Sequence, residues 1–374
     1  MAPVQVRGPV LTVRRIDAYH ALTMVAPPIA ARFGPGQFVT VAVGGPDSSM
    51  LLRRAFAIHD VRTDHGGTVE FVFAASEPGT RWLAQLRSRD MLDAVGPLGR
   101  PFPVPRESAS CLLVGAGAGS TGLFPLADRL RERGCQVDFL LGAESADHVF
   151  GALRARRIAR SATITTQDGS LGTRGVVTDL LSQVIHEART DVIYASAPLP
   201  VLRDVTALAS RYDLPVQAYV QEPAGCGTGV CMSCVLPVVG SDGITRIVRS
   251  CVDGPVFRGD MVRWDDVGTI PFDALGAPGW KPPRVLREEP PPPRRSQGSQ
   301  APNGSHAPNG SHAPNASQAP NASQAPNGSR APDGSHAPNG SRAPDRSQAP
   351  DRSQASRPPQ ARRPSAPRSS GHAD

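Results

Sequence analysis

The sequence predicts a multidomain protein with a β-barrel, an α/β domain built on a parallel sheet, a small cysteine-rich module and a disordered C-terminal tail. Three observations predict this order. Short β-branched runs separated by Gly-Pro turns fill about the first 104 residues, strands alternate with helices from Ser110, and cysteines cluster after Gln221. About 280 folded residues are more than one core usually supports. We place the four parts at residues 1–106, 107–218, 219–275 and 281–374.

The first part has the pattern of a small barrel. Alternating and β-branched residues predict strands at 4–13, 37–43, around 52–58, and at 68–73. Short strands with frequent turns between them favour a barrel. One helix is expected at 80–87, where apolar residues form a stripe with helical spacing.

The second part alternates between strands and helices, which indicates a parallel sheet covered on both faces. We expect strands at 111–114, 137–141, 162–166 and 191–195, and helices at 123–133 and 177–188. The first strand runs into a glycine-rich turn with Gly115, Gly117 and Gly119. A strand, a glycine turn and a helix N-terminus together make an anion site, because free N–H groups and the helix dipole face the phosphate. A tight turn without a ligand is the alternative.

Four cysteines form the pattern C-x4-C-x2-C-x16-C: Cys226, Cys231, Cys234 and Cys251. The first part of this spacing is typical of plant-type [2Fe–2S] centres. The glycines between the ligands allow positive φ and let backbone N–H groups approach the sulfurs. A zinc site is the alternative, although zinc ribbons prefer two CxxC pairs and only one is present; unrelated thiols are a third possibility. Cys111 and Cys135 stand apart, and we expect them to be structural.

A basic pair precedes an aromatic residue in the barrel region, at Arg53, Arg54 and Phe56. Arginine can hold a pyrophosphate by paired hydrogen bonds, and the aromatic ring can pack against a flat ring. A solvated basic edge is the other interpretation. Gly79 and Thr80 open the expected helix and add N–H donors for a phosphate.

The charge of the chain is concentrated in the tail. The 40 Lys and Arg exceed the 33 Asp and Glu by seven, and residues 281–374 hold 13 basic and 6 acidic residues, leaving 27 of each in residues 1–280. A neutral folded part gives no electrostatic reason to expect nucleic-acid binding. The tail repeats a hexad, Ala-Pro-Asn/Asp-x-Ser-x, nine times between Ala301 and Gln354. The tail cannot bury enough apolar surface to offset the loss of backbone conformational entropy on folding, about 1–2 kcal/mol per residue, so we predict that it is disordered.

Targeting and membrane signals are not apparent. The N-terminus has no charged-then-apolar signal pattern, and no stretch reaches about 18 uninterrupted apolar residues. We therefore expect a cytoplasmic protein without a membrane span, in which thiols stay reduced.

The motifs occur in a recognisable order. Arg54-Ala-Phe56 in the barrel is followed by Gly-Pro-Leu-Gly at 96–99, by the strand with Gly-x-Gly-x-Gly, and by the four-cysteine module. In this order the chain resembles the electron transfer subunit of dihydroorotate dehydrogenase, among the ferredoxin reductase-like flavoproteins, over about residues 5–270. The most specific stretches are 226–234 and Cys-Val-Asp-Gly-Pro-Val-Phe at 251–257.

This resemblance implies an FAD-binding barrel, a nucleotide-binding α/β domain and a [2Fe–2S] module on the four cysteines. An FMN-containing catalytic subunit, expected in a heterotetramer, oxidises dihydroorotate for pyrimidine biosynthesis, and its electrons pass through the cluster and FAD to NAD⁺. No acid–base catalytic residue is expected. The implied FAD contacts are Arg54, Ala55, Phe56, Ala57, Val72, Phe73, Ala74, Gly79 and Thr80, and the implied nucleotide contacts are Gly115, Gly117 and Gly119.

The chain departs from the family pattern at several positions. The family usually has Ser or Thr where Ala57 stands, and an aromatic-Arg pair where Phe73 and Ala74 stand. Two alternatives therefore remain beside the leading function. The chain could be a related FAD and [2Fe–2S] reductase subunit with a different redox partner, or a non-catalytic iron–sulfur redox sensor.

Overall fold

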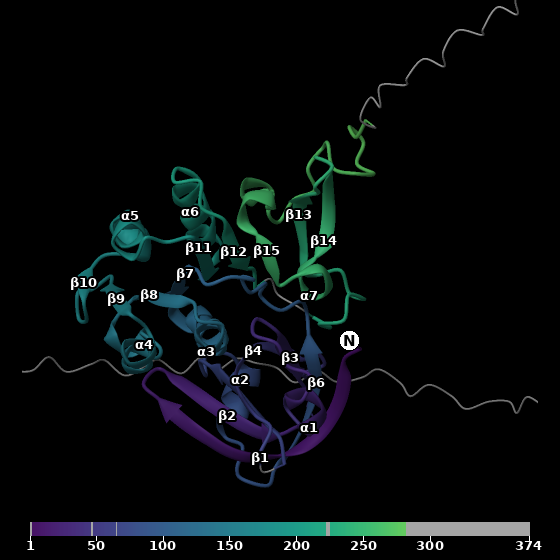
Figure 1. Ribbon diagram of the computed structural model, residues 1–374. Coiled ribbons are helices and arrows are strands. Elements are labelled where there is room, and N and C mark those ends of the chain that lie inside the picture. Colours follow the sequence, from purple (N-terminus) through teal and green to yellow (C-terminus); the bar gives the residue numbers. More distant parts are fainter. Residues whose placement is uncertain (1, 46–47, 65, 222–224, 282–374) are drawn as a thin grey trace, which may run out of the picture. The chain divides into compact units, whose positions relative to one another are not determined.

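The computed structural model describes residues 2–45, 48–64, 66–221 and 225–281 (Figure 1). The hexad repeats, and the disorder predicted for them, lie outside the described residues. Within those residues, none of the helices combines the length and the apolar character that crossing a membrane would require.

Six antiparallel strands close into a barrel in the order β1-β2-β5-β4-β3-β6, drawn in purple and blue in Figure 1. Its interior is apolar because alternate side chains, such as Phe56, Ile58 and Phe71, point inward. The predicted barrel is confirmed, although β2 and β6 were not predicted. The strands are β1 (Val4–Ile16), β2 (Tyr19–Val25), β3 (Phe38–Val41), β4 (Arg54–Arg62), β5 (Thr68–Phe73) and β6 (Met91–Leu98).

Two short helices accompany the barrel, α1 (Pro27–Ala30) and α2 (Pro78–Ala84). Helix α2 is the one predicted at 80–87, but it begins and ends earlier. The backbone N–H of Glu77 donates to Thr80 Oγ1 at 3.0 Å, and this contact fixes the start of the helix. The apolar stripe alone did not reveal this cap.

The α/β part contains a seven-stranded sheet in the order β10-β9-β8-β7-β11-β12-β15. The strands from β7 to β12 pair in parallel, and β15 is antiparallel to β12. The chain first adds strands on one side of β7 and then returns to the other side with β11, so the order reverses between these two strands. Its strands are β7 (Ser110–Ala116), β8 (Gln136–Ala143), β9 (Ser161–Thr166), β10 (Thr173–Arg174), β11 (Val192–Ser196), β12 (Val216–Tyr219) and β15 (Val256–Arg258).

Helices cover both faces of this sheet. Leu113 packs in the same cluster as α3 and α4, whereas its neighbour Leu112 packs with α5 and α6. Strands β7, β8, β9 and β11 and helices α3 and α5 were predicted; α4, α6 and β12 were not. The helices are α3 (Leu123–Glu132), α4 (Ala152–Ile158), α5 (Val177–Ala188) and α6 (Leu199–Ser210), with 3-10 turns η1 (Gly117–Gly122) and η2 (Ala146–His148).

The cysteine-rich module is a small hairpin with flanking turns, drawn in green in Figure 1. Cys234 and Cys251 share a cluster with Phe38 and Leu98, so the module packs against the barrel. It also contributes β15 to the large sheet. The domain boundaries themselves stay a prediction. The elements are β13 (Val235–Val239), β14 (Thr245–Arg249), α7 (Ser250–Asp253), η3 (Gly259–Met261) and η4 (Trp264–Asp266).

Candidate functional site

The four cysteines of the sequence pattern lie in one module. Cys226 and Cys231 belong to the loop after β12, where Cys231 is exposed, whereas Cys234 and Cys251 are buried against the barrel. The thiols interact in series: Cys231 with Cys226, Cys226 with Cys251, and Cys251 with Cys234. Cys111 is buried elsewhere, in the core of the α/β domain.

Backbone N–H groups surround the outer pair. Those of Thr228, Val230 and Cys231 all donate to Cys226 Sγ, at 3.4, 3.3 and 3.4 Å. Burial opposes the charged form of Cys226, but these N–H groups outweigh it and lower the pKa of the thiol to about 6. The Ser233 hydroxyl, 3.1 Å from Cys231 Sγ, lowers the pKa of that thiol as well.

The inner pair is in a different environment. Burial and the neighbouring Cys234 together raise the pKa of the Cys251 thiol to about 12, although a hydrogen bond from the Gly229 backbone acts in the opposite direction. The site therefore joins two thiols with a lowered pKa to Cys251, whose thiolate a positively charged partner, such as a metal group, would stabilise.

Glycines let the cysteine loop lie close to its neighbours. Gly227 and Gly229 have φ of +74° and +83°, in the left-handed region. A Cβ at Gly227 would lie 2.6 Å from Thr40 Cγ2, and one at Gly229 would lie 2.7 Å from Val252 Cγ2. Glycine is therefore required at both positions for conformation and for space.

The donor set fits an iron–sulfur group. Among the described residues, no three His, Cys, Asp or Glu side chains gather around a single metal position. The four thiols instead lie within one module and interact in series, with N–H donors directed at the sulfur of Cys226. Thiolate ligands supported by N–H hydrogen bonds are typical of iron–sulfur sites.

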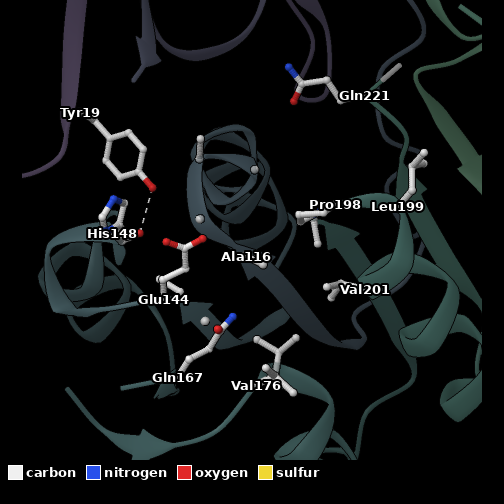
Figure 2. Close-up of a pocket in the computed structure, with 17 residues that line it drawn as sticks. Tyr19, Ala116, Glu144, His148, Gln167, Val176, Pro198, Leu199, Val201 and Gln221 are labelled. Carbon is white, nitrogen blue, oxygen red and sulfur yellow. Dashed lines mark hydrogen bonds between the residues drawn. The ribbon is translucent and has the colours of Figure 1, made fainter. Parts of the chain in front are cut away.

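A cleft of about 520 Å³ lies at the carboxyl ends of the parallel strands (Figure 2). Its lining follows β7, β8, β9 and β11 in turn, which is where ligands bind in open parallel sheets. Figure 2 shows Tyr19, Glu144 and His148 on one side and Pro198 and Val201 on the other.

The predicted glycine turn forms part of this cleft. Gly117 and Gly119 line it, and Gly115 lies just before them, where a Cβ would be 2.7 Å from the Ser120 side chain. A 3-10 turn follows the strand, so α3 begins only at Leu123, which is fully buried. The cleft is therefore lined by the turn itself. A Cβ at Gly119 would lie 2.7 Å from the carbonyl oxygen of Ser196.

Tyr19 reaches the cleft from the barrel, and the sequence did not predict it. Its hydroxyl donates to the carbonyl oxygen of His148 at 3.0 Å. Burial raises the pKa of Tyr19 to about 12, and the carboxylate of Glu144 adds to the effect. Glu144 directly follows β8 and could have been found from its position after a strand, but nothing local to Tyr19 places it at the cleft.

A second, smaller cavity of about 20 Å³ lies between the barrel, the end of β12 and the cysteine module. Ala55 and Ala57 line it from β4, and Cys251 lines it from the module. Gln221 lines both this cavity and the large cleft. The small cavity therefore lies between the cleft and the buried cysteines.

Strand alternation separates the predicted FAD contacts. The ring of Phe56 stacks on Phe71 at 4.9 Å, and Phe73 lies beside it in the barrel core. Phe56 also lines the small cavity, and its packing against a bound flat ring stays a prediction. Val72, Ala57 and Ala74 point the other way and pack with residues of the α/β domain.

Of the predicted arginine pair, Arg54 is the better placed to hold an anion. Arg53 is held by Asp93 and by the carbonyl oxygen of Thr40. Arg54 Nη1 donates to the carbonyl oxygen of Leu52 at 3.0 Å, and its buried Nε makes no hydrogen bond among the described residues but forms an ion pair with Glu77 at 3.4 Å. A Cβ at Gly79 would lie 3.3 Å from that nitrogen, so glycine keeps the space beside it open.

The chain matches a family model described as the iron-sulfur cluster binding domain of dihydroorotate dehydrogenase B, over residues 222–263. It is 39% identical over 235 residues to the dihydroorotate dehydrogenase B (NAD(+)) electron transfer subunit of Bacillus caldolyticus, covering 61% of this chain and 86% of that one. It is 32% identical over 247 residues to the probable equivalent of Methanopyrus kandleri, covering 66% and 87%.

Solved structures give the same fold. An NADH-dependent reduced ferredoxin-NADP oxidoreductase, studied for flavin-based electron bifurcation, has a TM-score of 0.62 and 28% identity, covering 70% of this chain and 91% of that chain. The ferredoxin reductase in carbazole 1,9a-dioxygenase has a TM-score of 0.50 and 18% identity, covering 58% and 69%. The predicted ferredoxin reductase-like fold is confirmed.

Proposed function

This chain belongs to the electron transfer subunits of dihydroorotate dehydrogenase B, and from that premise we propose that it passes electrons from a dihydroorotate-oxidising partner to NAD⁺ by way of a [2Fe–2S] cluster and FAD. One observation carries the proposal. Gln221 lines both the large cleft and the small cavity, and Cys251 lines the small cavity as well. Nucleotide, flavin and cluster would therefore be neighbours in that order.

The cluster would be held by the four cysteines of the pattern. The C-x4-C-x2-C spacing supports a two-iron cluster, since zinc ribbons prefer two CxxC pairs and this chain has one. The N–H groups directed at Cys226 Sγ would stabilise negative charge on the cluster. The bound cluster supplies one-electron transfer. Cys226, Cys231, Cys234 and Cys251 are the proposed ligands.

FAD would lie on the barrel, where a phosphate would take the place of the Glu77 carboxylate beside Arg54 Nε, which makes no hydrogen bond among the described residues, and Gly79 leaves room for it. The flavin ring would lie beside Ala55 and Ala57. Because about 20 Å³ is too small for such a ring, we expect residues 219–221 to shift when it binds. A bound flavin exchanges hydride with a nicotinamide and single electrons with an iron–sulfur centre.

NAD⁺ would occupy the large cleft. Gly117 and Gly119 bring the backbone close to the site of a pyrophosphate, as in other sheets that bind dinucleotides at the point where the strand order reverses. The nicotinamide would lie toward Gln221, which the cleft shares with the small cavity. The residues that line the cleft would position the nicotinamide ring and exclude water from it.

The partner would be an FMN-containing catalytic subunit, in a heterotetramer. It would dock over the exposed side of the cysteine loop, because apolar side chains surround the exposed Cys231 there: Val230 is 81% exposed and Met232 is 52% exposed. Exposed apolar side chains grouped around a redox site favour a protein interface. A cytoplasmic location stays a prediction.

The visible spectrum and iron content of the anaerobically purified full chain test this function. We expect oxidised flavin bands together with the broader absorption of an iron–sulfur cluster, both bleached by NADH. Cys231→Ser should abolish the cluster absorption and leave the flavin bands. Cys135→Ser is the matched control, since Cys135 lies outside the module, and it should keep both. A colourless protein containing zinc, or cluster absorption retained in Cys231→Ser, would contradict the proposal.

A further inference from the structure

Arg249 lies across the cysteine loop. It is the last residue of β14 and precedes Cys251 by two residues. Its guanidinium Nη1 donates to the carbonyl oxygen of Gly229 at 3.1 Å. Asp253 holds it in place: its Oδ2 accepts the backbone N–H of Arg249 at 3.0 Å and lies 3.9 Å from Nε.

The peptide group that receives this hydrogen bond also contacts a cysteine. Its carbonyl belongs to Gly229, and its N–H, on Val230, donates to Cys226 Sγ at 3.3 Å. A chain of two hydrogen bonds therefore runs from the guanidinium through one peptide to the sulfur. A cation on the carbonyl polarises the peptide and makes its N–H a stronger donor.

The close approach depends on glycine at position 229. A Cβ there would lie 3.2 Å from Arg249 Nη1 and 2.7 Å from Val252 Cγ2. The Gly229–Val230 peptide is planar and trans, so its carbonyl and its N–H point to opposite sides of the loop, the one toward Arg249 and the other toward Cys226.

We propose that Arg249 is a positioning residue that raises the reduction potential of the cluster through the Gly229–Val230 peptide. The inference rests on the cluster proposed above. Reduction adds one electron, and so one negative charge, to the cluster and its thiolates. A strengthened N–H···S hydrogen bond stabilises that added charge, and this favours the reduced form.

The test is a redox titration of the full chain, with the cluster followed by electron paramagnetic resonance and the flavin by absorption. Arg249→Gln should lower the cluster potential so that its reduction equilibrium falls about tenfold, which is about 59 mV for one electron. The flavin potential should stay unchanged. Arg249→Lys keeps the charge and should retain most of the wild-type potential.

The matched control is Arg246→Gln. Arg246 is on the same strand and carries the same charge, but it binds Asp242 at the hairpin turn, at 2.7 and 2.8 Å. Its removal should leave the cluster potential unchanged. An equal shift in Arg246→Gln and Arg249→Gln would overturn the proposal, because it would show a general effect of charge.

The outcomes separate this inference from the proposed function. A wild-type chain without iron overturns the function and the inference with it. A loaded Arg249→Gln protein with an unchanged potential overturns the inference alone. If Arg249→Gln does not load, Asp253→Asn decides: loss of the carboxylate that holds Arg249 should release the guanidinium from the Gly229 carbonyl and lower the cluster potential, whereas an unchanged or raised value, as loss of a nearby negative charge alone would give, overturns the proposal.

Discussion

The cysteine loop and the large cleft are built in opposite ways. In the loop, backbone groups within a few residues of one another make the site: three N–H donors converge on one sulfur, and two glycines hold the turns. In the cleft, the ends of four strands and a barrel tyrosine each contribute a small part of the lining. The loop should therefore fail after single changes that the cleft would tolerate.

The largest effect is expected for Gly227→Ala, which tests the fragility of the loop. The new Cβ would lie 2.6 Å from Thr40 Cγ2, and the φ of +74° alone costs a non-glycine residue on the order of 1–3 kcal/mol. We expect most of the iron to be lost while NADH binding to the cleft changes less than about twofold. Iron analysis and NADH titration measure the two sites.

Gly243→Ala is the control for this change. Gly243 has the same φ of +74°, but nothing lies within 4 Å of its Cβ position. It should keep its iron. Comparable iron loss in both variants would mean that backbone strain, and not the contact with the barrel, holds the loop.

A smaller effect is expected for Gly119→Ala in the cleft. The added Cβ would lie 2.7 Å from the carbonyl oxygen of Ser196, so the turn must move away from β11. Such overpacking typically costs about 1–3 kcal/mol, and we expect the KM for NADH to rise about tenfold in steady-state reduction of an artificial acceptor. The iron content should not change. Iron loss with an unchanged KM for NADH would contradict the expectation that this change affects the cleft and leaves the cysteine loop intact.

The smallest effect is expected for Tyr19→Phe, which removes the hydrogen bond to the His148 carbonyl. We expect the free energy of unfolding at pH 7 to fall by about 1 kcal/mol, as for a single neutral hydrogen bond. Urea unfolding measures this change. An effect on iron content would show that the cleft and the loop are coupled.

The same variant should alter stability at high pH. Burial, with a further contribution from Glu144, raises the pKa of Tyr19 from 10.0 to about 12 in the folded state. The folded protein therefore keeps the phenol protonated where the unfolded chain has lost the proton. The part of the free energy of unfolding that depends on the protonated phenol of Tyr19 is therefore fully present below pH 10 and is lost as the pH rises toward about 12. The stability of Tyr19→Phe should accordingly fall less than that of the wild type over this range.

Local patterns predicted much of the fold. The apolar runs of β7, β8, β9 and β11 were visible because both faces of these strands are buried, and α5 was predicted at the bounds that the structure has. Strand β2 was not predicted. It becomes part of the barrel by pairing with β1 and β5, and this pairing is not visible in its own residues. Strand β15 has only three residues, and its pairing with β12 makes it a strand.

Side-chain direction was harder to predict than residue type. Arg53 and Arg54 are neighbours in sequence, yet Arg53 is held by Asp93, whereas Arg54 Nε makes no hydrogen bond among the described residues and is paired with Glu77 at 3.4 Å. The ring of Phe56 lies in the barrel core, because adjacent residues of a strand point to opposite sides. Phe56 nevertheless lines the small cavity together with Ala55 and Ala57, and residue type alone did not show this arrangement.

The sequence by itself predicted the cysteine site, because three of the proposed ligands and their glycines lie close together along the chain, with the spacing of a single loop, and Cys251 follows one hairpin later. Only the tertiary structure decided what surrounds that site. Tyr19 enters the cleft from the barrel, Arg249 reaches the Gly229 carbonyl twenty residues before it, and Gln221 lines two cavities, and none of these contacts follows from the motifs. The physical reason is that backbone hydrogen bonds within a loop follow from local conformation, whereas a cavity shared by several strands exists only once the sheet and the barrel have packed together.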